Sequence, residues 1–577
     1  MAQRAQGTRR VWVPAAFLGA FALVVFGRLV QLQVIDHPKY AQAAEQEQTG
    51  HETIYARRGS ILDRNGNVLA ASVDTWDISV NSRVWAEEAQ ATASSQALAN
   101  ELNVDAGSLR VAVAKGVAEG HVQILLKKDV EFETGKRIIA DGIPGVVTDP
   151  DTKRVNPEGD VGATIVGLIG GENSGLSGIE SSYNDVLQGK PGKTIYERDT
   201  VGDAIPFGKY IAENPQPGSD MVLTIDRYVQ QLAEQALDKA ITDHKATGGS
   251  ITVMDPATGE ILALASRPGL KYSTLDLNDP KTTSLLNNAA VTNLYEPGSV
   301  MKIITAASAI DQGVVTADTT YVDNGVVDIY GIPIKNFQDE VWGTQTMTGV
   351  LQHSINTGAV FMVEKLGAAT FQRYLDAFGF GKFSGIDFNG DSEGIFRRPS
   401  DAGWSPVDLA TQAFGQSISV TPIQMTSAIA AAINGGNLMR PHFVKARVGA
   451  DGIRQDVKPE VIDRAISAQT SATIRSMLGQ VVTQDADGTG RSPRNYTAGG
   501  KSGTANVPVY GSYNDRQIIS FAGFAPLDNP RILVLVKVDD NADGQTGTVA
   551  GGPIFASLAD QILRYMNVPP DKGPAKQ

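Results

Sequence analysis

The sequence predicts an α+β fold in which helices sandwich an antiparallel sheet built from both ends of one large domain. Apolar runs flank a turn at 256–259 and another at 528–530, so each end of the domain supplies a hairpin. Apolar residues follow helical spacing at 229–241 and 554–563. If the two hairpins pair with each other, the helices that lie between and beside them cover the faces of the sheet.

Each element has its own local signal. Residues 221–225 are typical of a strand, and Asp226 follows them as the expected N-cap of the helix at 229–241. Pro-Ala-Thr-Gly at 256–259 and Asp-Asn-Pro at 528–530 are turn sequences. The strands expected around these turns are 251–255, 261–266, 518–524 and 532–538.

The region before residue 218 has a different pattern, in which short strand-like runs are separated by turns rich in Gly, Asn and Asp. Asn65-Gly66 is typical of a hairpin turn, and the Asn-Pro-Gln-Pro-Gly segment at 214–218 predicts a linker. A charged group, Arg57, Arg58, Asp63 and Arg64, is consistent with a catalytic cluster or with an ion-paired structural corner, and we favour the corner.

The N-terminus predicts one membrane span. An uncharged run begins at Val11, continues to Gly27, and is extended by apolar residues to Ile35, which suffices to cross a bilayer. Arg4, Arg9 and Arg10 precede it, so the N-terminus is expected in the cytoplasm and the rest outside. A cleaved signal peptide is the alternative, although no small-residue cleavage site closes the run. The predicted regions are a cytoplasmic tail at 1–10, a transmembrane helix at 11–35, a pedestal at 36–217, a catalytic domain at 218–570 and a tail at 571–577.

Composition excludes several functions. The net charge of −13 argues against a nucleic-acid partner, because phosphates require a basic surface. The chain has no cysteine, and its six histidines show no metal-binding spacing, so disulfides, thiol nucleophiles and a zinc site are not expected. We predict no metal and no cofactor.

Gly500-Lys501-Ser502 raises the question of a phosphate-binding loop. Such a loop needs a glycine where this chain has Asn495, and a helix where it has Pro508. The nucleotide interpretation therefore fails, and the segment is typical of a strand that runs into a turn.

A serine and a lysine at helical spacing are better candidates for chemistry. Pro297-Gly298 is a turn before an alanine-rich helical run, so Ser299 lies in the first turn and Lys302 lies on the same face. A neighbouring amine can accept the serine proton, and helix N-terminal amides favour developing negative charge, as acyl transfer requires. This spacing also arises by chance.

Two further motifs complete an ordered set. Ser354-Ile355-Asn356 precedes a helical run, and Lys501-Ser502-Gly503-Thr504 lies on a strand-like edge. A surface location is a fair alternative for any single match, but the order and the local contexts together favour a site.

The ordered set resembles the penicillin-binding proteins and serine β-lactamases. The rest of the chain resembles class B penicillin-binding proteins, most closely the septal, cell-division type, and so implies their transpeptidase fold behind a pedestal. The matching segments are 58–66, 178–180, 223–226, 296–299, 414–416, 421–422 and 501–505. The chain departs from the family at Val300-Met301, often Thr-Phe, and at Ser417, often glycine.

The resemblance implies a membrane-anchored D,D-transpeptidase. Ser299 would be the nucleophile, Lys302 the base and Ser354 the proton relay, while Asn356 holds Lys302 and the substrate. Lys501, Ser502, Gly503 and Thr504 would receive the substrate carboxylate and backbone, with amides of Ser299 and Thr504 as the oxyanion hole. Lys501 and burial are expected to lower the pKa of Lys302.

The expected partners are peptidoglycan stem peptides on lipid-linked nascent glycan, β-lactam antibiotics, a division-type membrane glycan polymerase and other divisome proteins. Three alternatives stay open: a side-wall transpeptidase, a β-lactamase and a non-catalytic sensor. The chain lacks the Gly-x-Ser-x-Gly of Ser-His-Asp hydrolases, and we expect His353 to be a polar neighbour of the site.

Overall fold

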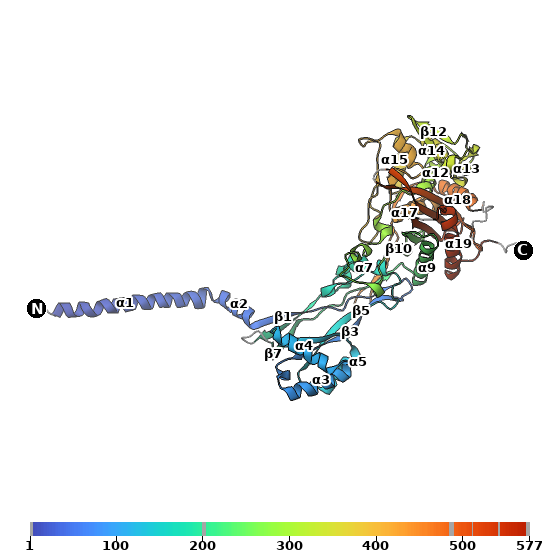
Figure 1. The fold of residues 1–577 in the computed structure, drawn as a ribbon. Helices are drawn as coiled ribbons and strands as arrows, with labels where there is room; N and C mark the ends of the chain where they lie inside the picture. Colours follow the sequence, from blue (N-terminus) through green and yellow to red (C-terminus); the bar gives the residue numbers. More distant parts are fainter. Residues whose placement is uncertain (1–3, 199–203, 484–489, 510–511, 541–542, 573–577) are drawn as a thin grey trace. The chain divides into compact units, whose positions relative to one another are not determined.

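The computed structural model describes residues 4–198, 204–483, 490–509, 512–540 and 543–572 (Figure 1). The chain forms two compact units. The first comprises Met1–Arg57 and Gly189–Pro217, and the second comprises Arg58–Gln188 and Gly218–Gln577. The boundary between Pro217 and Gly218 falls inside the predicted linker at 214–218. Residues of the predicted pedestal occur in both units, and most of the predicted tail at 571–577 lies outside the described residues.

The first unit carries the N-terminal helices and a small sheet. Among the described residues, one helical stretch, Trp12–Ile35, is long and apolar enough to cross a membrane, and it closely matches the predicted span at 11–35. The elements of the first unit are helix α1 (Arg4–Val30), π-helix η1 (Gln31–Ile35), helix α2 (His37–Gln48) and the antiparallel strands β1 (Thr49–Ile54), β6 (Gly192–Arg198) and β7 (Ala204–Glu213).

The central sheet of the second unit is fully antiparallel and is built from both ends of the domain. Its strand order is β10 (Ile261–Arg267), β9 (Gly248–Met254), β23 (Ile532–Asp539), β22 (Ser512–Ala525) and β21 (Gly499–Val509). The two predicted hairpins meet where β9 pairs with β23, for example at Val253 and Val534. The predicted fold class is confirmed, and β21 is an edge strand.

Helices cover both faces of this sheet (Figure 1). Along β23, Leu533 and Leu535 point into one core cluster, while Val534 and Val536 point into another, as strand alternation requires. The second cluster is closed by α9 (Arg227–Asp243) and α19 (Gly547–Tyr565), and the first by α12 (Lys302–Asp311), α17 (Pro422–Ile433) and α18 (Ala468–Thr483). Every residue of α17 is buried.

The N-terminus of α9 confirms the predicted cap. The Asp226 carboxylate accepts hydrogen bonds from the backbone amides of Tyr228 and Val229. A cap of this kind is worth about 1 kcal/mol.

A second sheet joins residues from before and after the linker. Its elements are β19 (Arg454–Asp456), β18 (Val444–Val448), β8 (Asp220–Leu223), β2 (Ile61–Leu62), β3 (Val68–Asn81), β4 (Gln123–Glu131) and β5 (Val146–Val155). The predicted hairpin turn lies between β2 and β3. There Asp63 accepts from the backbone amides of Asn65 and Asn67, and Gly66 has a φ of +88°.

The remaining elements are shorter or lie at the periphery of these sheets. The helices are α3 (Glu88–Leu102), α4 (Ala106–Ala118), α5 (Phe132–Asp141), α6 (Ala163–Val166), α7 (Gly178–Ser182), α8 (Asn184–Leu187), α10 (Thr282–Leu285), α11 (Ala289–Thr292), α13 (Met347–Gln352), α14 (Asn356–Leu366), α15 (Ala368–Ala377) and α16 (Pro406–Gln412). The strands are β11 (Thr320–Asp323), β12 (Val326–Ile329), β13 (Ile332–Lys335), β14 (Gly343–Thr346), β15 (Ile395–Phe396), β16 (Ile418–Ser419), β17 (Asn437–Met439) and β20 (Val461–Arg464).

Candidate active site

Ser299 lies at the start of a buried helix, as the sequence predicts. The first turn is the 3₁₀ segment η5 (Gly298–Met301), which continues directly into α12. Gly298 has a φ of +57°, and a Cβ there would lie 2.9 Å from the carbonyl oxygen of Thr504 on β21. Glycine therefore lets the helix start approach the edge strand closely.

Lys302 places its amine beside the Ser299 hydroxyl. The side chain is fully buried, and Nζ lies 3.0 Å from Ser299 Oγ, in accord with one helical turn between them. The amine also donates to Asn356 Oδ1 at 2.7 Å and to the backbone carbonyl of Ser354.

Ser354 and Asn356 lie where α13 ends and α14 begins. Ser354 has a φ of +58°, an uncommon conformation for a residue with a side chain, and Asn356 is the first residue of α14. Ser354 Oγ lies 3.3 Å from the Lys302 amine and accepts from Lys501 Nζ at 2.9 Å. The structure thus brings together Ser299, Lys302, Ser354, Asn356 and Lys501, which come from three distant segments.

Both lysines have pKa values below that of a lysine in water. Burial lowers the pKa of Lys302 well below its ordinary value, and the nearby charge of Lys501 lowers it further. Burial, with the charge of Arg491, lowers the pKa of Lys501 to about 7. A neutral Lys302 can accept a proton, which a lysine in water at pH 7 cannot do.

The strand that carries Lys501 presents alternate side chains to opposite sides. Ser502 and Thr504 line a cleft in front of Ser299, and Thr548 donates to Ser502 Oγ at 2.9 Å.

Gly503 faces the interior. A Cβ there would lie 2.6 Å from Ser520 Oγ and 2.9 Å from the Pro297 carbonyl oxygen, so contact with η5 is a reason for glycine besides room for a substrate.

The cleft has a volume of about 320 Å³ and is open to solvent. Ser299, Ser354, Asn356, Ser502 and Thr504 line it. Its other lining residues are Gly298, Asn336, Phe337, Glu340, Trp342, His353, Ile355, Phe414, Gln416, Asn506, Gln517, Thr546 and Thr548.

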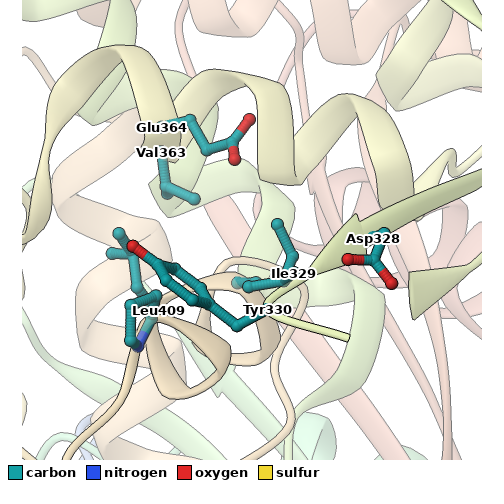
Figure 2. Close-up of a pocket in the computed structure, with 8 residues that line it drawn as sticks. Asp328, Ile329, Tyr330, Val363, Glu364 and Leu409 are labelled. Carbon is teal, nitrogen blue, oxygen red and sulfur yellow. The ribbon is translucent and has the colours of Figure 1, made fainter. Parts of the chain in front are cut away.

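A separate hollow of about 220 Å³ lies between the β12–β13 turn, α14 and α16. Figure 2 shows Tyr330 extended above Leu409, with Asp328 and Glu364 at its margins. None of the predicted site residues lines it.

Two family models match the chain. "Penicillin binding protein transpeptidase domain" matches residues 249–560, and "Penicillin-binding Protein dimerisation domain" matches residues 53–223. The chain belongs to the class B penicillin-binding proteins. The resemblance that the motifs predict is confirmed, and this penicillin-binding protein is a transpeptidase.

Relatives match this penicillin-binding protein over most of their length. Stage V sporulation protein D of Bacillus subtilis is 34% identical over 96% of this chain and 86% of the relative. Peptidoglycan D,D-transpeptidase FtsI of Escherichia coli is 28% identical over 97% and 93%. The crystal structure of penicillin-binding protein 3 from Mycobacterium tuberculosis with ampicillin superposes with a TM-score of 0.68, at 27% identity over 91% of this chain and 98% of that one.

Sequence reasoning missed several residues around the site of this penicillin-binding protein. Arg491 is a third buried cation, and Thr548 contacts Ser502. Asp323 and Asn336 form a buried network behind Asn356. Neither type nor spacing distinguishes these residues, because their partners are set by the pairing of distant segments.

His353 lies at the margin of the cleft. Its ring stacks on Trp342 with 3.9 Å between ring centroids, and burial lowers its pKa. The ring therefore contacts the wall of the cleft, and the role of a polar neighbour stays a prediction.

Proposed function

We propose that this peptidoglycan D,D-transpeptidase is anchored in the plasma membrane and crosslinks stem peptides through an acyl-enzyme on Ser299. One observation carries the proposal: the buried Lys302 amine lies 3.0 Å from Ser299 Oγ, within a cleft that also holds Ser354 and the edge strand of Lys501. A nucleophile beside a base of lowered pKa is what acyl transfer requires.

The proposed acylation begins when Ser299 Oγ attacks the carbonyl carbon of the penultimate D-alanine of a stem peptide. The hydroxyl proton passes to the lone pair of Lys302. As the C–N bond breaks, the leaving amine takes a proton through Ser354, and the terminal D-alanine departs. An amine from a second stem then attacks the acyl carbon. The C–O bond to Ser299 breaks as the new amide forms the crosslink, and the proton that the attacking amine loses passes to Ser299 Oγ.

The proposed substrate lies along β21. An extended peptide can pair with an exposed strand edge through main-chain hydrogen bonds. Its terminal carboxylate would bind the Ser502 and Thr504 hydroxyls near Lys501, and Asn356 would bind its backbone. Amides of Ser299 and Thr504 would form an oxyanion hole, in which each donor is worth about 3–4 kcal/mol.

The proposal also covers the membrane topology, the cellular role and the protein partners. The apolar helix Trp12–Ile35 and the arginines before it support a cytoplasmic N-terminus and an extracytoplasmic catalytic domain. The resemblance to the septal type favours septal wall synthesis with a division-type glycan polymerase and other divisome proteins. Enrichment of a tagged copy at midcell supports this role, whereas uniform side-wall signal favours an elongation enzyme.

Labelling with a fluorescent penicillin tests the nucleophile. We expect covalent label on the wild type and on Ser284→Ala, which alters an exposed serine, but none on Ser299→Ala. Label that persists on Ser299→Ala refutes the assignment.

The lifetime of the label separates transpeptidase from β-lactamase. An adduct that lasts many minutes excludes efficient hydrolysis of the antibiotic. Rapid turnover of the penicillin would favour the hydrolase.

A further inference from the structure

Asp323 is a buried carboxylate that lies one layer behind the site. It ends β11 and is 1% exposed. Its oxygens accept hydrogen bonds from the backbone amides of Gly325 and Trp342, at 3.0 and 2.8 Å, and from Thr357 Oγ1 at 2.6 Å. Within the described part of the chain no lysine or arginine forms an ion pair with Asp323. Burial raises the pKa of this carboxyl, but these donors and Asn336 outweigh burial, and the pKa is lowered.

The same carboxylate fixes the orientation of the Asn336 amide. Asn336 Nδ2 donates to both Asp323 oxygens at 3.0 and 2.9 Å. Its Oδ1 accepts from the backbone amides of Asn356 and Thr357 at 3.0 and 3.1 Å. Because an ionised carboxylate only accepts and a backbone N–H only donates, the amide fits in one orientation.

Segment 335–336 therefore holds Asn356 at two points. Asn336 binds its backbone amide, and the Lys335 carbonyl accepts from Asn356 Nδ2 at 2.9 Å. A carbonyl can only accept, so the Oδ1 end of Asn356 must face the Lys302 amine, at 2.7 Å.

This orientation decides where the lone pair of a neutral Lys302 points. A neutral amine has two hydrogens and one lone pair. Asn356 Oδ1 and the Ser354 carbonyl oxygen both lie within hydrogen-bond reach and can only accept, so each takes one hydrogen. The lone pair is left for a hydroxyl, and Ser299 Oγ at 3.0 Å is nearer than Ser354 Oγ at 3.3 Å.

We propose that Asp323 is a positioning residue for acylation: through Asn336 it holds segment 335–336 against Asn356, so that the Lys335 carbonyl keeps the Asn356 amide in the orientation that directs the Lys302 lone pair at Ser299. The inference rests on the proposed roles of Ser299 and Lys302. An Asn356 amide turned the other way would donate to the Lys302 lone pair and remove the acceptor of the serine proton.

Stopped-flow acylation of the full-length protein by a fluorescent penicillin tests this role. We expect Asp323→Asn to lower the first-order acylation rate constant about 100-fold, as for a misplaced catalytic group, with the dissociation constant of the non-covalent complex changed by less than about threefold. The matched control is Asp318→Asn, which makes the same change of charge at an exposed position and leaves both constants unchanged. A loss confined to the rate constant distinguishes positioning from general damage to the cleft.

A second variant keeps the test decisive if Asp323→Asn does not fold. Asn336→Asp places two carboxylates together, and the double variant Asp323→Asn/Asn336→Asp restores a donor opposite an acceptor. We expect the double variant to acylate at least tenfold faster than Asn336→Asp. Equal rates, or a folded Asp323→Asn that acylates within threefold of the wild type, overturn the proposal. Either result leaves the proposed function intact, because that function is tested separately, by the label on the wild type and on Ser299→Ala and by the lifetime of the adduct.

Discussion

Arg58 Nε lies 2.5 Å from Glu180 Oε2, and the two side chains are 0% and 2% exposed. The remaining guanidinium donors of Arg58 bind the Glu180 and Asn173 carbonyls and Asn184 Oδ1. Arg154 pairs with the other oxygen of Glu180 at 2.7 Å. Two segments that the sequence singled out, 58–66 and 178–180, thus meet at one buried carboxylate.

Glu180→Ala is expected to lower the free energy of unfolding by about 3–5 kcal/mol, because it leaves two buried guanidinium groups without their counter-charge. Urea unfolding of the detergent-solubilised chain measures the loss. Glu133→Gln, at an exposed ion pair with Lys136, is the control and changes stability by less than about 0.5 kcal/mol. A Glu180→Ala variant as stable as the wild type would show that this triad contributes nothing net.

Physical reasoning from the sequence predicted what depends on local spacing. Ser299 and Lys302 could be placed together because one helical turn separates them, and Asp226 could be recognised as a cap by its position before an apolar helix. The corner around Arg58 was also predicted. Its acidic partner was not, since Asp63 binds backbone amides and Glu180 forms the ion pair.

Long-range partners could not be predicted in this way. Ser354 and Lys501 are 147 positions apart, and only the order of the family motifs suggested that they meet. Asp323 and Asn336 carry no motif at all. Asn336 binds backbone amides at the start of α14, and this pairing depends on the packing of β13 against that helix.

The lowered pKa of Lys501 has a consequence for stability. The pKa of Lys501 is about 7 in the folded protein, and that of a lysine in the unfolded chain is about 10.4. This difference lowers the free energy of unfolding by its full amount below pH 7, and the loss shrinks as the pH rises from 7 toward 10.4. Lys501→Met removes this loss. We therefore expect the variant to exceed the wild type in stability at pH 6.5, with the advantage falling by about 1.4 kcal/mol per pH unit above pH 7.

Urea unfolding at several pH values measures this difference. Lys239→Met, at an exposed lysine on α9, provides the control and shows no such slope. An advantage of Lys501→Met that is independent of pH would mean that the amine keeps an ordinary pKa in the fold.

Gly503→Ala tests how closely β21 approaches η5. The added methyl group would meet Ser520 Oγ, the Pro297 carbonyl and Val300 Cγ2 at 2.6 to 2.9 Å, so the strand must move away from the turn that carries Ser299. We expect a loss of about 1–3 kcal/mol in stability and at least a tenfold slower acylation by penicillin. Gly171→Ala, where a Cβ meets nothing within 4 Å, should alter neither. Unchanged acylation in Gly503→Ala would show that this contact does not set the geometry of the site.

His353 should be replaceable without loss of chemistry. Burial lowers the pKa of the imidazole, and the ring is stacked on Trp342, so its contribution is to the wall of the cleft. His353→Phe keeps a ring for stacking and removes both nitrogens, and we expect penicillin acylation to change by less than about threefold. A general acid or base contributes about 10²- to 10⁴-fold, so the two roles differ clearly in the measured rate constant. A hundredfold loss in His353→Phe at an unchanged unfolding temperature would assign the imidazole a part in proton transfer, whereas a loss seen only in Trp342→Ala places the contribution in the packing of the wall.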